Sequence, residues 1–151
     1  MYYLVKTPWW LKKIYNKFVW EADKTNKKLY LTFDDGPHPK ITPFFFFLLR
    51  KFNAKATFFC IGQNVERNPD TYRQIINEGH SIGNHTFNHL NGCRTDDAVY
   101  LDNVAKAQLF IDSRLFRPPY GKITGFQRQQ LAAPRFGMQC VMWSVVSGDF
   151  D

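Results

Sequence analysis

Short apolar runs alternate with longer amphipathic stretches from Leu29 to the C-terminal end of the chain. The apolar runs predict strands at residues 29–33, 56–61, 81–84, 115–117 and 138–143. The stretches between them predict helices at residues 42–52, 69–79, 96–111 and 125–134. Strands that alternate with helices in this way indicate an α/β fold with a parallel sheet and right-handed crossovers. About five strands are too few to close an eight-stranded barrel.

Cap and turn residues mark the predicted helix ends. Helix starts are indicated by Thr42-Pro43, Asn68-Pro69, Thr95 and Thr124, and a helix end by Gly79. The run from Phe44 to Phe47 places aromatic side chains on all sides of the first helix after residue 29. This pattern predicts burial on more than one face of that helix.

The first 20 residues carry a different pattern. Apolar residues at positions 10/11, 14/15 and 18/19 recur at helical spacing, with lysines between them. Two interpretations remain open: a helix that docks on its own domain, or a basic, tryptophan-bearing helix that makes weak contact with a membrane surface through residues 1–20. We divide the chain into an N-terminal aromatic and basic helical extension, residues 1–28, and an α/β domain, residues 29–151.

Composition narrows the classes of partner. The 151 residues suffice for one domain with a hydrophobic core, in which we expect most of the 15 Phe. The net charge is +7, but the basic residues are scattered along the chain. The sequence has no RNA-binding motif, zinc-finger spacing or long basic run, so we expect no nucleic-acid partner.

The three cysteines, Cys60, Cys93 and Cys140, do not have the number or spacing of a disulfide framework or a cysteine-based zinc site. Cys60 and Cys140 lie in apolar runs and are expected to be small buried side chains. No stretch approaches the roughly 20 apolar residues of a membrane-spanning helix. The first residues also lack the continuous apolar core of a secretory signal.

Polar residues with catalytic potential lie just past the predicted strands: Asp34-Asp35, His85, Arg117 and Asp149. In parallel α/β folds, chemistry gathers where strands end and helices begin. A turn at Gly36 would bring both carboxylates to one rim of the sheet. Each of these motifs alone is also typical of an ordinary turn or loop. A site is predicted because all of them lie just past the end of a predicted strand.

His85 and His89 are four residues apart, which on a helical turn places both imidazoles on one face. With an Asp as third ligand, they predict a divalent metal site that keeps positions open, as catalytic zinc sites do. We assign zinc first, with cobalt, nickel or manganese as alternatives, because nitrogen and oxygen ligands accept all of them.

The segment Arg117-Pro118-Pro119-Tyr120-Gly121 is predicted to be extended and stiff. It could hold a permanently charged guanidinium against a carboxylate. A backbone N–H near Tyr120 could face a developing oxyanion.

Three ordered segments together resemble the motifs of the polysaccharide deacetylase family (the NodB-homology domain, carbohydrate esterase family 4). They are Thr32-Phe33-Asp34-Asp35-Gly36-Pro37, His85-Thr86-Phe87-Asn88-His89 and Arg117-Pro118-Pro119-Tyr120-Gly121. The resemblance implies a distorted, incomplete (β/α) barrel. It also implies a hydrolase that removes N-acetyl groups from chitin- or peptidoglycan-type glycans and releases acetate.

The resemblance further implies the role of each site residue. The metal ligands would be Asp35, His85 and His89. Asp34 would be the catalytic base, Arg117 would orient it, and the Tyr120 main-chain N–H would stabilise the oxyanion. Thr86, Pro118 and Tyr120 would contact the substrate or the acetate product, and Asp149 would be a further catalytic carboxylate.

Two departures from the family pattern bear on turnover. The family's proton donor is a histidine in a late Leu-x-His motif, and no histidine follows His89 here. The family often has Asp-x-x-Asp-Trp, where this chain has Val146 and Phe150 and keeps only Asp149. These departures predict that the C-terminal part of the domain is missing. They leave open, as an alternative, an impaired homologue that binds metal or glycan.

The remaining expectations concern the other two histidines, the partner and the compartment of the protein. His80 is interpreted as a hydrogen-bonded structural histidine and His38 as an exposed residue near the site. We expect a monomer whose partner is an acetylated amino-sugar oligo- or polysaccharide. This substrate class suggests the cell envelope, while the sequence leaves the compartment open.

Overall fold

The computed structural model of the chain describes residues 5–22, 25 and 27–147. Its centre is one parallel sheet whose five strands lie side by side in chain order. They are β1 (Leu31–Gly36), β2 (Ala56–Cys60), β3 (Ser81–Asn84), β4 (Leu115–Phe116) and β5 (Gln139–Cys140). Neighbouring strands in sequence order are the arrangement of a (β/α) barrel, and five strands leave it open. The predicted α/β class and parallel sheet are therefore confirmed.

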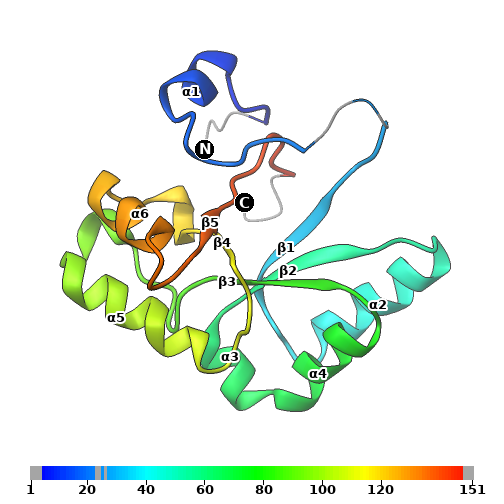
Figure 1. The fold of residues 1–151 in the computed structure, drawn as a ribbon. Coiled ribbons are helices and arrows are strands. Elements are labelled where there is room, and N and C mark those ends of the chain that lie inside the picture. Colours follow the sequence, from blue (N-terminus) through cyan, green and yellow to red (C-terminus); the bar gives the residue numbers. More distant parts are fainter. Residues whose placement is uncertain (1–4, 23–24, 26, 148–151) are drawn as a thin grey trace.

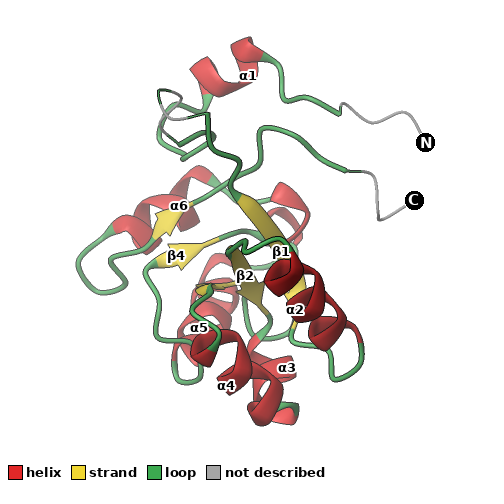
Figure 2. Cartoon of the chain, turned by 90° about the vertical axis from the view of Figure 1, so that its right-hand side faces the viewer, coloured by secondary structure: helices red, strands yellow, loops and turns green. Residues whose placement is uncertain are grey.

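Six α-helices belong to the described part of the chain. They are α1 (Trp9–Ile14), α2 (Ile41–Lys51), α3 (Gly62–Arg67), α4 (Pro69–Asn77), α5 (Asp97–Gln108) and α6 (Gly125–Ala132). Short 3₁₀ turns cover Gly92–Arg94 and Pro119–Gly121. Helices α2 to α6 are arranged around the sheet, and α1 lies apart from them at one end of the molecule (Figure 1, Figure 2).

The core consists of two clusters of buried side chains. One cluster packs α2, α3 and α4 against β2 and includes Phe46, Phe58 and Ile75. The other packs α5 and α6 against β4 and β5 and includes Tyr100 and Phe116. Each such side chain contributes about 1.5–3 kcal/mol on burial, so the two clusters hold the strands whose ends carry the site.

Helix α2 differs from its prediction in its start and in its burial. It begins at Ile41, with Lys40 as the N-cap residue, and Thr42 lies inside its first turn. The Phe46 side chain is fully buried, whereas Phe44 and Phe47 are each 58% exposed. The expectation of burial on several faces was wrong, because α2 packs one face on the sheet and leaves the others uncovered.

The other helix ends follow local hydrogen bonding. Asp96, not the predicted Thr95, caps α5, because its carboxylate accepts hydrogen bonds from the N–H groups of Ala98 and Val99. Thr124 caps α6 as predicted, through a reciprocal pair of bonds with Gln127. The sequence did not predict α3, which has only six residues.

The N-terminal segment forms a shorter helix than its periodicity predicted. On either side of α1 the segment makes isolated β-bridges. Lys6, before the helix, pairs antiparallel with Val145, and Val19, after it, pairs in parallel with Val141. These bridges attach the segment next to β5, while Trp9 remains 75% exposed. The boundary between an extension of residues 1–28 and the domain stays a prediction. None of the described helices has the length and apolar character needed to cross a bilayer.

The cysteines match their prediction. Cys60 and Cys140 are buried, Cys93 is exposed, and all three are free thiols. Burial raises the pKa of the Cys60 thiol to about 12 and that of the Cys140 thiol to about 12.

Candidate active site and metal centre

The carboxyl end of β1 holds both aspartates in an irregular stretch of strand. The register of β1 on β2 shifts between Phe33 and Gly36. Within this stretch Asp35 adopts a left-handed backbone, with φ at 66°. Adjacent residues of a regular strand point to opposite faces, and a bulge can re-aim one of them. With this irregular stretch included, β1 ends at Gly36 and not at its predicted end, residue 33.

Asp35, His85 and His89 converge on one point. The Oδ1 atom of Asp35 lies 3.4 Å from His85 Nε2 and 3.1 Å from His89 Nε2. The ligand atoms of the three residues all lie within 4.8 Å of one another. Zinc bonds of about 2.0–2.2 Å place tetrahedral ligand atoms roughly 3.3–3.6 Å apart. The donor set and its spacing thus fit a divalent ion after only small adjustments.

The electrostatics favour the ligand form of the carboxylate. The close approach of His85, and next of His89, holds the pKa of the Asp35 carboxyl well below its usual range. Partial burial opposes this effect but is outweighed. Asp35 is therefore ionised at neutral pH, as a cation ligand must be.

Each imidazole has a partner on its other ring nitrogen. Nδ1 of the buried His85 lies 2.6 Å from the carbonyl oxygen of Arg117. Because a carbonyl only accepts hydrogen bonds, Nδ1 is the donor there, and Nε2 faces Asp35. Nδ1 of His89 lies 3.1 Å from the Tyr120 hydroxyl. Partners of this kind orient metal-ligating histidines in proteins.

The segment that joins the two histidines is a loop and not a helical turn. Thr86 and His89 have left-handed φ values of 65° and 63°. The Thr86 N–H donates to Asn84 Oδ1 at 2.8 Å, and the Phe87 N–H donates to Asn103 Oδ1 at 2.8 Å. The expected helical turn was wrong. The imidazoles meet because side-chain hydrogen bonds and two strained residues shape the loop.

Helix α3 braces this loop and the Asp35 strand. Its first N–H groups need partners outside the helix, and the Gly62 N–H donates to the Thr86 carbonyl at 2.9 Å. A Cβ atom on Gly62 would lie 2.8 Å from the Phe87 ring, so only glycine allows this approach. Asn64 Nδ2 donates to the Asp35 carbonyl at 2.7 Å. The helix that the sequence did not predict therefore holds two parts of the site.

Asp34 lies beside the metal ligands in an ion pair with Arg117. The Arg117 Nη1 atom donates to Asp34 Oδ1 and to Thr32 Oγ1, both at 2.8 Å. Its Nε and Nη2 atoms donate to the carbonyls of Val141 at 3.2 Å and Met142 at 3.1 Å. These four bonds leave the guanidinium little freedom, so it holds Asp34 in one orientation.

The surroundings of the guanidinium are largely apolar. The Arg117 side chain is 3% exposed, and its Cζ lies 4.1 Å from the Phe59 ring centroid and 5.5 Å from that of Trp143. Burial lowers the pKa of Arg117, and the charge of Asp34 offsets part of that effect. A guanidinium nevertheless stays charged.

The other predicted site residues differ in exposure. Thr86 is fully buried, and its Oγ1 accepts a bond from the Leu90 N–H at 3.3 Å. Pro118 is also buried. Tyr120 is 60% exposed with φ at 59°, and its N–H donates to no acceptor in the described part of the chain. Asp149 lies outside the described residues.

The two remaining histidines lie apart from the metal ligands. His80 is buried, with its ring centroid 5.8 Å from that of Phe46 and 5.4 Å from that of Phe58. Neither of its ring nitrogens has a hydrogen-bond partner among the described residues, so the expectation of a hydrogen-bonded histidine was wrong. Burial lowers the pKa of His80. His38 is exposed, as predicted.

Comparisons with known proteins agree with the motifs. The family model described as polysaccharide deacetylase matches residues 21–141. A peptidoglycan-N-acetylglucosamine deacetylase of Bacillus cereus is 41% identical over 130 residues, which are 83% of this chain and 60% of the relative. A chitooligosaccharide deacetylase of Azorhizobium caulinodans is 37% identical over 137 residues, 85% of this chain and 63% of the relative.

A solved structure has the same fold. It is a crystal structure of a peptidoglycan N-acetylglucosamine deacetylase, with a TM-score of 0.80 and 31% identity. The match covers 88% of this chain and 64% of that protein. The chain thus spans less than two thirds of the length of each of these three proteins.

Proposed function

The chain belongs to the polysaccharide deacetylase family, and on this premise we propose that it carries the site of a metal-dependent hydrolase that removes N-acetyl groups from amino-sugar polysaccharides. The observation that carries the proposal is the convergence of Asp35, His85 and His89 within 4.8 Å, next to the ion pair of Asp34 and Arg117 at 2.8 Å. The first group suits a divalent cation, and the second suits proton transfer beside it.

The two aspartates have different roles in this proposal. A divalent ion held by Asp35 and the two histidines would supply Lewis acidity, polarising the amide carbonyl and lowering the pKa of water to about 7 for zinc. Asp34 accepts a proton from the water that attacks the acetyl carbon. Arg117 keeps Asp34 oriented for that transfer.

The charge that develops on the acetyl oxygen needs a donor. The Tyr120 N–H donates to no acceptor in the described part of the chain, so it is available to the oxyanion. The carbon–nitrogen bond then breaks, the amine takes up a proton from solvent or from Asp34, which returns to its ionised form, and acetate leaves. Buried Thr86 and Pro118 shape the walls of the site rather than presenting exposed groups, and we keep Asp149 as a further catalytic candidate.

An impaired homologue is the second candidate, and one feature of the sequence favours it. The four histidines are His38, His80, His85 and His89. Two of these are the proposed ligands, and His80 is buried among aromatic rings. The Nδ1 atom of the exposed His38 accepts hydrogen bonds from the Lys40 and Ile41 N–H groups. None of the four is therefore assigned as the proton donor to the leaving amine. On this alternative the chain binds metal or glycan with little turnover.

We also propose the finer points of the site and its partners. Zinc is the first assignment for the ion, with cobalt, nickel or manganese as alternatives, because two imidazoles and one carboxylate suit all four. The glycan is of the chitin or peptidoglycan type, and the protein acts as a monomer. Weak contact with a membrane surface through residues 1–20 is a separate expectation.

One experiment separates the two candidates. The full chain is stripped with a chelator, its zinc binding is measured by calorimetry, and acetate release from N-acetylglucosamine oligomers is followed with zinc or cobalt restored. One ion bound per chain together with metal-dependent acetate release supports the hydrolase. One ion bound without acetate release supports the impaired homologue, and the absence of metal binding would refute the proposed site.

A further inference from the structure

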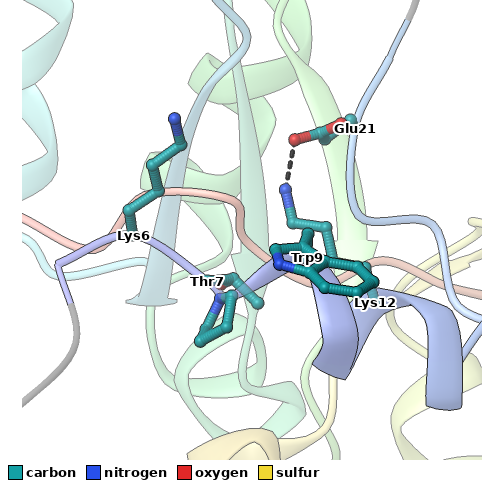
Figure 3. Close-up of a pocket in the computed structure, with 6 residues that line it drawn as sticks. Lys6, Thr7, Trp9, Lys12 and Glu21 are labelled. Atoms are coloured by element: carbon teal, nitrogen blue, oxygen red, sulfur yellow. Dashed lines mark hydrogen bonds and ion pairs between the residues drawn. The ribbon is translucent and has the colours of Figure 1, made fainter.

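A cavity of about 460 Å³ lies outside the proposed active site. It is lined by Lys6, Thr7, Pro8, Trp9, Lys12 and Glu21 (Figure 3). None of these residues is a proposed metal ligand. All but Glu21 precede the region that the family model covers, residues 21–141, so the cavity is a feature of the N-terminal segment.

Among the described residues, one positive charge of the cavity has no carboxylate partner. Lys12 Nζ forms an ion pair with the Glu21 carboxylate (Figure 3), so these two charges offset each other. Lys6 is exposed and forms no ion pair within residues 5–22, 25 and 27–147. A ligand with one carboxylate would therefore complement the cavity.

The aromatic wall of the cavity suits a sugar ring. The Trp9 side chain is 75% exposed, which leaves its indole uncovered where it lines the cavity. An amphipathic ligand can place an apolar face on such a ring while its polar groups reach neighbouring side chains. A pyranose has such an apolar face, formed by its C–H groups. The combination of Trp9 and Lys6 thus fits an acidic saccharide better than a neutral one.

A short chain of contacts connects the cavity with the proposed site. Thr7 Oγ1 donates to the Trp143 carbonyl at 2.8 Å, and the Thr7 N–H donates to the Ser144 carbonyl at 3.0 Å. The Trp143 ring lies 5.5 Å from Cζ of Arg117, and Arg117 holds Asp34. These contacts attach the segment that lines the cavity to the residues that hold Asp34.

We propose that this cavity is a binding subsite for a saccharide unit that bears a carboxylate. It would hold one unit of an acidic glycan while the N-acetyl group of another unit lies at the metal site. This inference rests on the proposed function and narrows its substrate from amino-sugar glycans in general to acidic ones. The carboxylate can belong to the sugar itself or to a peptide attached to it.

Binding of three glycans to the full chain tests the subsite. The probes are chitotetraose, a tetrasaccharide of alternating N-acetylglucosamine and N-acetylmuramic acid, and the same tetrasaccharide with its peptides. Calorimetry in a chelator measures affinity without turnover, for wild type and for Lys6→Gln, Trp9→Ala and Lys13→Gln. Lys13 is the matched control, because it is an exposed lysine of α1 that does not line the cavity.

We expect the wild-type chain to bind the acidic glycans about threefold more tightly than chitotetraose, the size of effect that one exposed charge pair gives. Lys6→Gln should abolish this preference, Trp9→Ala should weaken binding of all three glycans about fivefold, and Lys13→Gln should change neither. A preference for either acidic glycan supports the subsite, and the glycan preferred identifies the source of the carboxylate. Equal wild-type affinities, or an equal effect of Lys13→Gln, would overturn it.

Two further measurements keep this proposal separate from the proposed function and from membrane contact. If acetate is released but Lys6→Gln does not alter glycan preference, the subsite fails and the hydrolase stands. If the binding pattern is found without acetate release, the subsite stands and the hydrolase fails. If Lys6→Gln and Trp9→Ala reduce sedimentation with phosphatidylglycerol vesicles and leave glycan binding unchanged, a membrane surface replaces the saccharide.

Discussion

Replacing Asp34 by asparagine separates proton transfer from metal binding, because the two aspartates are adjacent but have different partners. Asp34 Oδ1 accepts a hydrogen bond from Arg117 Nη1 at 2.8 Å, whereas Asp35 Oδ1 faces the two histidines. The amide of Asp34→Asn keeps an oxygen for Arg117 but cannot act as a base. We therefore expect bound metal and a lost reaction.

The magnitudes follow from the burial of the pair. Removal of a general base slows a reaction by roughly 10²–10⁴-fold, so acetate release should fall within this range. Breaking a buried ion pair costs about 3–5 kcal/mol. Asp34 is 31% exposed, and an oxygen remains to accept the bond, so we expect a loss of about 1–2 kcal/mol in the free energy of unfolding. Zinc affinity should fall by no more than about tenfold, from the unneutralised charge of Arg117.

The assay compares Asp34→Asn with Asp35→Ala and with Asp112→Asn, an exposed aspartate on the loop before β4. Zinc calorimetry, acetate release and urea unfolding are measured on each chain. Asp35→Ala should lower zinc affinity by more than the roughly 10–100-fold that a supporting contact costs, and Asp112→Asn should change nothing. Loss of the ion from Asp34→Asn, with the ion retained by Asp35→Ala, would refute the assigned roles.

Four further predictions concern individual side chains. Tyr120→Phe removes the hydroxyl 3.1 Å from the Nδ1 atom of His89, and zinc calorimetry should show an affinity roughly tenfold lower; an unchanged affinity would mean that the hydroxyl does not support the ligand. His89→Gly and His89→Ala both remove the imidazole, but only glycine adopts the φ of 63° at this position without strain. Urea unfolding should therefore find the glycine variant more stable by about 1 kcal/mol. A more stable alanine variant would contradict backbone strain at His89. An alkylating reagent at pH 8 should label Cys93 and spare Cys60 and Cys140, because burial raises the pKa of each of these two thiols to about 12. Above the unfolded thiol pKa of about 9, the same two groups should make stability fall as pH rises, since only the unfolded chain then ionises them; unfolding midpoints at pH 8 and pH 10 that coincide would argue against this burial.

Local sequence patterns were sufficient for the order and type of most elements. The five strands lie where apolar runs predicted them, because a short buried strand needs only a continuous apolar segment between turns. Element ends were less predictable. Asp96 caps α5 instead of its neighbour Thr95, since either residue type can cap and the packing of the helix selects one. Helix α3 has too few residues for a periodic signal.

The histidine loop illustrates a second limit of local patterns. A spacing of four residues is typical of a helical turn, but here the two rings meet through a different backbone conformation. The Asn84 and Asn103 side chains hold the loop, and Gly62 allows α3 to approach it. These residues lie on other elements, so their contribution has no signature near the histidines.

Chemical identity is a property of the sequence alone: two carboxylates, two imidazoles and a guanidinium in a fixed order indicate the family and its type of chemistry. Their geometry came from the tertiary structure, which placed Asp35 where the register of β1 shifts, set the Tyr120 hydroxyl against His89 and buried Arg117 near the rings of Phe59 and Trp143. The physical reason is the sequence separation of the residues that interact. Residue type and spacing encode what a side chain can donate, accept or ligate, whereas distances between atoms on different strands depend on how the whole sheet and its helices pack.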